Sequence, residues 1–113
     1  MANAVALGLN ELNSQYKPKY TGDDSLDKFI ERLNAFLCDR HRIDEVKNGE
    51  AACLYFEGYE EIPDELDFYG DVIKSEFENK GWHVWIFFPP RQAGIAFKTS
   101  PPNRKDPGIW EGL

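Results

Sequence analysis

The chain contains few cysteines and no apolar stretch long enough to cross a membrane. Two cysteines, Cys38 and Cys53, occur among its 113 residues, and each lies in an apolar run. Two cysteines do not make the disulfide framework of a small secreted domain, and a free thiol in an apolar run is usually a small core residue. The first residues, MANAVALGLNEL, lack the basic region and the long apolar region of a signal peptide. We therefore expect a soluble, cytoplasmic protein that does not bind a membrane.

Positive charge is also scarce. The chain has 13 lysines and arginines against 20 aspartates and glutamates, which gives a formal net charge of −7. A general nucleic-acid binder needs cations that displace counterions from phosphates, so we expect no direct binding to nucleic acid. Aromatic residues make up 14% of the chain, which argues against disorder. The length predicts a single domain over residues 1–113, with an irregular N-terminal segment at 1–23 and a proline-rich C-terminal tail at 100–113.

Common catalytic motifs are absent as well. The sequence has no glycine-rich phosphate loop, no G-x-S-x-G and no H-E-x-x-H. A structural zinc site normally has ligands in closely spaced pairs, and a thiol nucleophile needs a base and an orienting group. The spacing of the cysteines and histidines indicates neither arrangement, so we expect no catalytic residue, no metal site, no cofactor and no enzyme activity. The residues considered for such a site are Cys38, His41, Cys53 and His83.

The most informative stretch, residues 61–88, predicts a helix followed directly by a strand. Pro63 suits the first turn of the helix, and Lys80 followed by Gly81 suits its end. Between them, apolar residues recur at spacings of three and four, as in a helix with one buried stripe. Gly70 lies on this stripe, where it would allow another backbone to approach closely. We predict a helix over residues 63–80 whose stripe is made of Ile62, Leu66, Tyr69, Ile73 and Phe77.

Residues 82–88 predict the strand itself. Alternate residues point to opposite faces of a sheet, and here both sets are largely apolar, so we expect a central strand covered on both sides. Two prolines at 89 and 90 end it. Residues 94–99 predict a second strand, close enough to form an antiparallel hairpin with the first. One face of residues 82–88 carries Trp82, Val84, Ile86 and Phe88, and the other carries His83, Trp85 and Phe87.

Two further elements precede this stretch. Residues 25–40 predict an amphipathic helix with Asp27, Glu31 and Asn34 on its polar side. Residues 51–57 predict a strand, with a buried helix as the alternative because this run is apolar throughout. The expected fold class is therefore α+β: a small antiparallel sheet, with strands near 51–57, 82–88 and 94–99, and two main helices packed mostly on one face. The other face would be covered by the tail or by a second chain.

Acidic residues are concentrated between positions 57 and 78, where Lys74 is the single cation. This pattern is typical of a solvated helix face, but it also suits a surface that binds a basic partner or imitates DNA phosphates. We interpret it as a partner-binding surface and add a tryptophan of the tail as an interface anchor. The predicted partner-binding residues are Glu57, Glu60, Glu61, Asp64, Glu65, Asp67, Asp71 and Trp110.

These observations predict a non-catalytic protein-binding module, an inhibitor or a regulatory adaptor, whose partner is another protein with a basic surface. One alternative is a DNA mimic that inhibits a nucleic-acid-binding protein, and another is a small thiol- or zinc-dependent enzyme. The sequence also leaves a homodimer open, in which basic residues near the C-terminus of one copy would meet the acidic helix of another. Those basic residues are Arg91, Lys98, Arg104 and Lys105.

Overall fold

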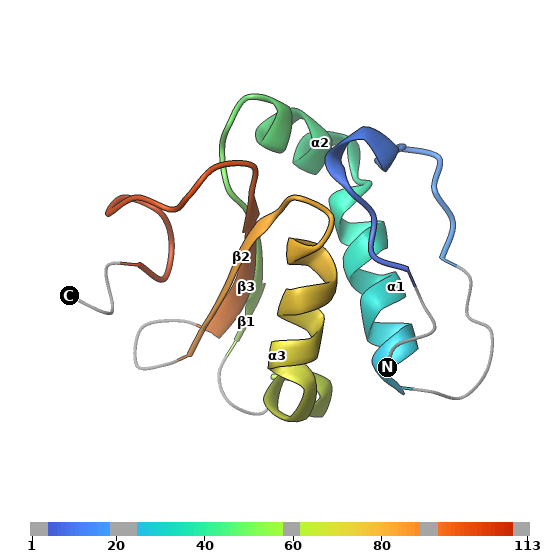
Figure 1. Ribbon diagram of the computed structural model, residues 1–113, viewed down its shortest axis with the longest axis vertical. Coiled ribbons are helices and arrows are strands. Elements are labelled where there is room, and N and C mark those ends of the chain that lie inside the picture. Colours follow the sequence, from blue (N-terminus) through green and yellow to red (C-terminus); the bar gives the residue numbers. More distant parts are fainter. Residues whose placement is uncertain (1–4, 19–24, 58–61, 89–92, 110–113) are drawn as a thin grey trace.

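The computed structural model describes residues 5–18, 25–57, 62–88 and 93–109. It confirms the α+β class: a three-stranded antiparallel sheet has helices on one face and the C-terminal segment on the other (Figure 1). The described elements are a 3₁₀ turn η1 (Leu9–Glu11), three helices and three strands: α1 (Ser25–Leu37), α2 (Arg40–Lys47), β1 (Ala52–Phe56), α3 (Asp64–Glu78), β2 (His83–Phe87) and β3 (Ala93–Lys98).

The helix predicted over residues 25–40 ends early, and a separate helix follows it. Asp39 has an extended backbone, with φ −62° and ψ 136°, and its carboxylate accepts a hydrogen bond from the backbone N–H of His41 at 3.0 Å. Aspartate is among the best residues at this capping position, because it satisfies an N–H that has no partner within the helix. The two predicted main helices are present as α1 and α3, and this cap starts α2 as a third helix that the sequence interpretation did not include.

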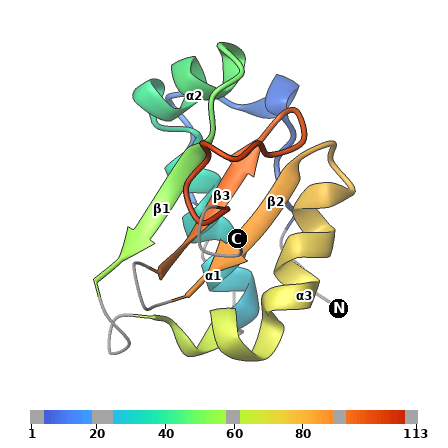
Figure 2. The same ribbon diagram turned by 90° about the vertical axis from the view of Figure 1, so that its left-hand side faces the viewer.

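The strand order is β1-β3-β2, so β3 is the central strand. The prediction that residues 82–88 form the central strand was wrong, because β2 lies at an edge. Its hairpin with β3 is confirmed, with Ile86 opposite Ile95 and Val84 opposite Phe97. β2 is apolar on both faces because α3 covers one of them and the C-terminal segment covers the other (Figure 2). The apolar residues on both faces of β2 therefore indicated that both faces are covered. They did not indicate whether the strand lies at the centre or at the edge of the sheet.

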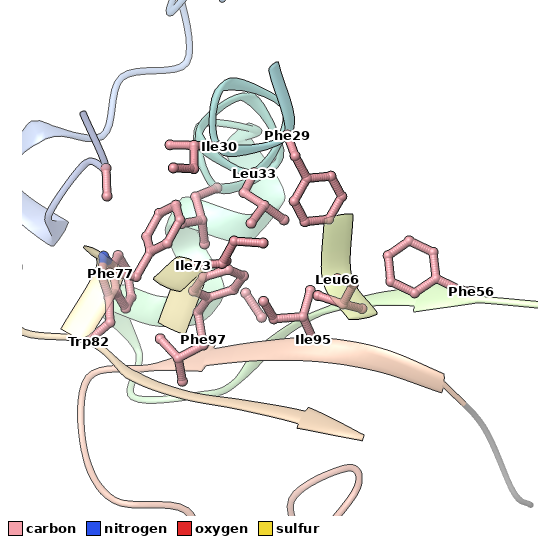
Figure 3. Close-up of a cluster of buried hydrophobic side chains, with 14 of the residues drawn as sticks. Phe29, Ile30, Leu33, Phe56, Leu66, Ile73, Phe77, Trp82, Ile95 and Phe97 are labelled. Carbon is pink, nitrogen blue, oxygen red and sulfur yellow. The ribbon is translucent and has the colours of Figure 1, made fainter. Parts of the chain in front are cut away.

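The main core lies between the sheet and the helices α1 and α3, and Phe97 of β3 is at its centre (Figure 3). The ring centroid of Phe97 lies 5.0 Å from that of Phe77, 6.1 Å from Trp82 and 6.4 Å from Phe36. Fully burying a side chain of this size contributes roughly 1.5–3 kcal/mol, so this aromatic cluster is a major source of stability. It also fixes how α3 lies against β2, which positions the surface described below.

The N-terminal segment is bound to the body through Asn34. The side-chain amide of Asn34 accepts a hydrogen bond from the N–H of Leu7 at 3.0 Å and donates one to the carbonyl oxygen of Val5 at 2.8 Å. The indole N–H of Trp82 donates to the carbonyl oxygen of Leu7 at 2.7 Å. Asn34 was expected on a polar face but is fully buried, because residues 5–9 cover that side of α1. The surroundings of Asn34 are thus made by a segment that is far from it in sequence, and helical periodicity cannot predict such a contact.

Two more polar residues of α1, Asp27 and Glu31, are buried although they were expected on its polar face. The hydroxyl of Tyr16 donates a hydrogen bond to the carboxylate of Glu31. Burial, together with the hydrogen bond to the neighbouring carboxylate of Glu31, raises the pKa of Tyr16 to about 12. The segment that follows η1 therefore covers the same side of α1 as residues 5–9.

The apolar stripe of α3 is interrupted near its beginning. Leu66, Ile73 and Phe77 are buried as predicted, but Tyr69 is 42% exposed and has non-helical angles, φ −120° and ψ 19°. This kink changes the direction of the side chains in the first turns, so the prediction that Tyr69 is part of the buried stripe was wrong. Gly70 faces the side chain of Ile86, not another backbone: a Cβ at Gly70 would lie 3.4 Å from Cδ1 of Ile86.

The C-terminal segment closes the second face of the sheet without regular structure. The indole N–H of Trp85 donates to the carbonyl oxygen of Pro107 at 2.7 Å, and Lys98 forms an ion pair with Asp106 at 2.8 Å. Gly108, at φ +81°, lies directly on the ring of Phe87: a Cβ there would come within 2.5 Å of that ring. The sequence left either the tail or a second chain as the cover of this face, and the structure places the tail on it. Trp110 falls outside the described residues.

Candidate functional site

The predicted acidic surface is on the first half of α3. Asp64, Asp67 and Asp71 are exposed there, and Glu65 is half-buried. Glu57 is exposed just after β1. Carboxylates in the first turn of a helix are stabilised by the helix dipole, which accounts for part of this arrangement without any partner. Of the other predicted partner-binding residues, Glu60, Glu61 and Trp110 lie outside the described part of the chain.

Exposed apolar residues lie among these carboxylates. Phe68 is 80% exposed, and Tyr69, Val72 and Phe88 are 42%, 37% and 41% exposed. A single exposed apolar residue is ordinary, but a group of large ones rimmed by polar residues marks interaction surfaces. The sequence interpretation missed Phe68 entirely. The sequence does contain a signal for the exposure of Phe68. Phe68 is out of helical phase with Leu66 and Ile73, the buried residues on either side of it, so it points away from the buried stripe.

A groove separates this half of α3 from the end of β2. Its volume is about 450 Å³. The absence of a side chain at Gly70 leaves room in it, and Ile86 contributes to its lining from the strand. One part of the lining is apolar and the other part is charged, so the groove can accept an apolar group next to a cation. The lining residues are Leu66, Asp67, Phe68, Gly70, Asp71, Lys74, Ile86 and Phe88.

The electrostatics of the groove favour the binding of a cationic group. Asp67 and Asp71 are four residues apart on one helix, where like charges repel each other by a few tenths of a kcal/mol. Lys74 is the only cation in α3, against six carboxylates. A lysine or arginine of a partner placed between Asp67 and Asp71 would relieve that repulsion. The groove therefore combines apolar lining residues with two carboxylates and a single cation.

The thiol–histidine arrangement considered for an enzyme is not assembled. Cys53 on β1 pairs with Ala96, and His83 on β2 pairs with Lys98, so the central strand separates them by roughly 10 Å. Burial raises the pKa of the Cys53 thiol to about 11. A nucleophilic cysteine needs the opposite shift, because the thiolate is the reactive form.

Across residues 5–18, 25–57, 62–88 and 93–109, no three His, Cys, Asp or Glu side chains form a group that could hold a metal ion. No helix within those ranges has the length and apolarity that crossing a bilayer requires.

The basic residues suggested for a homodimer contact are not collected on one free surface. Lys98 is 7% exposed and is paired with Asp106 of its own tail, so it is not available to the acidic helix of another copy. Arg104 and Lys105 are exposed in that tail, and Arg91 is outside the described residues. The predicted pairing between copies therefore loses one of its four cations to an internal ion pair.

The chain was compared with protein-family models, with curated proteins and with solved structures. No family model matches it, and neither comparison with individual proteins gave a significant match.

Proposed function

We propose that this chain is a non-catalytic protein-binding module, an inhibitor or regulatory adaptor, that binds a basic partner through the first half of α3. The observation that carries the proposal is the 80% exposure of Phe68 between the exposed carboxylates of Asp67 and Asp71. Interfaces commonly have an aromatic centre and a polar rim, and this surface has both.

The two parts of the surface have different roles in this proposal. Burying the ring of Phe68 against a partner would contribute about 2–3 kcal/mol, comparable with a single interface hot spot. The carboxylates would mainly accelerate the encounter and exclude acidic partners, and their effect would weaken with added salt.

The apolar centre also separates this proposal from DNA mimicry. A protein that binds phosphates presents cations and polar groups, and it gains little from an exposed phenylalanine. A partner that recognises α3 in place of DNA would be displaced by duplex DNA, whereas a partner that recognises Phe68 would keep part of its affinity. Competition with duplex DNA therefore distinguishes the two functions.

The test is affinity capture from the native host with wild-type protein and two variants. The first variant carries Asp67→Lys, Phe68→Ser and Asp71→Lys, three exposed positions whose replacement should leave folding intact. The control carries Asp44→Lys and Glu50→Lys, which are exposed at the opposite end of the molecule (Figure 1). Circular dichroism checks that both variants fold.

The expected result is a protein retained by the wild type and by the control but lost with the α3 variant, identified by mass spectrometry and verified with purified components. Identical captured proteins for all three baits would refute the proposed surface.

A further inference from the structure

We propose that the groove beside α3 receives an extended segment of the partner, which adds a strand to the free edge of β2. This segment would place an apolar side chain in the groove and a lysine or arginine at Asp67 and Asp71. The inference rests on the proposed function, and it specifies the form in which the partner binds.

The first argument is the open edge. In the order β1-β3-β2, the side of β2 away from β3 has no strand partner among the described residues. Edge strands are commonly protected by proline, by lysine or by a bulge, because unpaired N–H and C=O groups recruit other strands. The sequence of β2, HVWIF, contains neither proline nor lysine. An edge that has no strand partner and that a groove separates from the neighbouring helix is the arrangement that strand-adding recognition uses.

The second argument is the position of the groove relative to that edge. α3 runs alongside β2 at the outer side of the sheet (Figure 2). Ile86 and Phe88, two residues apart, both contribute to the groove lining. A strand added about 4.8 Å from β2 would point every second side chain toward α3. Within that set, the middle side chain would meet Ile86 and Phe68, and the ones two residues before and after it would reach the carboxylate rim.

The third argument concerns which strand fits. A second copy of this chain could offer its own β2, but symmetric pairing of two β2 edges would also bring two α3 helices together. Each α3 carries six carboxylates and one lysine, so that arrangement concentrates negative charge. Like charges placed together disfavour association. A segment that carries lysine or arginine and an apolar residue on the side that faces α3 reverses the sign of this interaction.

The probe is a six-residue peptide, capped at both ends, that carries lysine, phenylalanine and lysine on one of its two alternating sets of side chains and threonine on the other set. Two modified peptides accompany it, each N-methylated on one of the two alternating sets of amides. In an added strand, one set of amides donates to β2 and the other points to solvent. Binding is followed by ¹⁵N–¹H spectra of the full chain and by amide exchange of β2.

The expected result has three parts. The parent peptide shifts and protects amides of residues 83–87 and shifts residues 67–74. One methylated peptide binds as the parent does, and the other binds more weakly by a factor of about ten or more, because its three methylated amides no longer donate to β2. The Asp67→Lys, Asp71→Lys variant loses the peptide, while the Asp44→Lys, Glu50→Lys control retains it.

Three results would overturn the inference. Equal binding of both methylated peptides would show recognition by side chains alone. Shifts confined to other elements, or no binding at millimolar peptide, would remove the groove as the receptor. A concentration-dependent doubling of mass with protection of β2 would make a second copy the occupant. Capture of a partner through α3 is measured separately, so each of these results leaves the proposed function to its own test.

Discussion

On the helix side of the sheet, Phe97 lies among the rings of Phe36, Phe77 and Trp82, and two helices close the layer. On the opposite side, the ring of Phe87 lies between Gly94 and Gly108, and an irregular tail closes the layer. Alternate residues of the same strands supply the side chains of the two faces. One face is closed by many non-directional apolar contacts, and the other by a few directional bonds to a single segment.

This difference indicates where the molecule can open. Regions with few apolar contacts and few backbone hydrogen bonds open locally at lower free energy than the core. The tail depends on the carboxylate of Asp106, which accepts from Lys98 and from the N–H of Asn103, both at 2.8 Å, and on the Trp85–Pro107 bond. The tail should therefore detach before the helices do.

The largest expected effect is on the helix face. Phe97→Ala should lower the free energy of unfolding by about 4 kcal/mol, because it leaves a cavity among three aromatic neighbours. Urea unfolding followed by circular dichroism measures this loss. If Phe97→Ala lowers the free energy of unfolding by less than the exposed control Phe68→Ala does, the assigned centre of the core is incorrect.

On the tail face, Asp106→Ala should cost up to about 3 kcal/mol, since Lys98 is then left at 7% exposure without its carboxylate. Release of the tail would lower this cost by returning Lys98 to water, and limited proteolysis between residues 99 and 109 would detect that release. Asp44→Ala, on exposed α2, is the matched control. Unchanged stability with an unchanged cleavage pattern would contradict the role of this ion pair.

A smaller effect should distinguish two glycines. Gly94→Ala would place a Cβ 2.8 Å from the carbonyl oxygen of Leu54 and 2.6 Å from the ring of Phe87, so we expect a loss of about 2 kcal/mol. Gly70→Ala has its nearest neighbour at 3.4 Å and lies in a helix, so we expect a gain of up to about 1 kcal/mol. Thermal unfolding of the two variants measures both. Equal shifts in Tm would contradict the different surroundings of the two glycines.

The last effect is absent at neutral pH and develops only at alkaline pH. Burial raises the pKa of Cys53 from 9.0 to about 11 and that of Tyr55 from 10.0 to about 12. The folded state thus retains protons that the unfolded state loses, and the stability from Cys53 is present below pH 9.0 and declines toward about pH 11. Urea unfolding across this range should show a shallower decline in Cys53→Ala than in the wild type. Parallel curves would contradict this assignment.

Periodicity predicted the elements but not their neighbours. The stripes of α1 and most of α3 and the hairpin follow from spacings of two, three and four, whereas the run that forms β1 is apolar throughout and left a buried helix as the alternative. The central position of β3 was missed because Gly94 and Ala96 are small and gave no strong strand signal. The burial of Asn34 depends on residues 5–7, and the exposure of Tyr69 depends on a kink. Long-range contacts decide each of these features, and local sequence patterns do not contain them.

The candidate site was predicted in part for the same reason. The sequence located Asp64, Asp67 and Asp71 on one helix, because charge and helical phase are local properties. The groove required knowing that α3 lies against β2 and that β2 ends the sheet. The exposed Phe68 was missed because apolar residues were assigned to the interior by default.

Trp82 and Trp85 lie three residues apart, and their indole groups donate to carbonyl oxygens from opposite ends of the chain, Leu7 and Pro107. Their emission can therefore report separately on the two ends. In a Trp110→Phe background, replacing either Trp82 or Trp85 by phenylalanine leaves one tryptophan, whose emission senses mainly the release of the end or of the beginning of the chain. Time-resolved unfolding of this pair of variants would give the order in which the two ends leave the sheet.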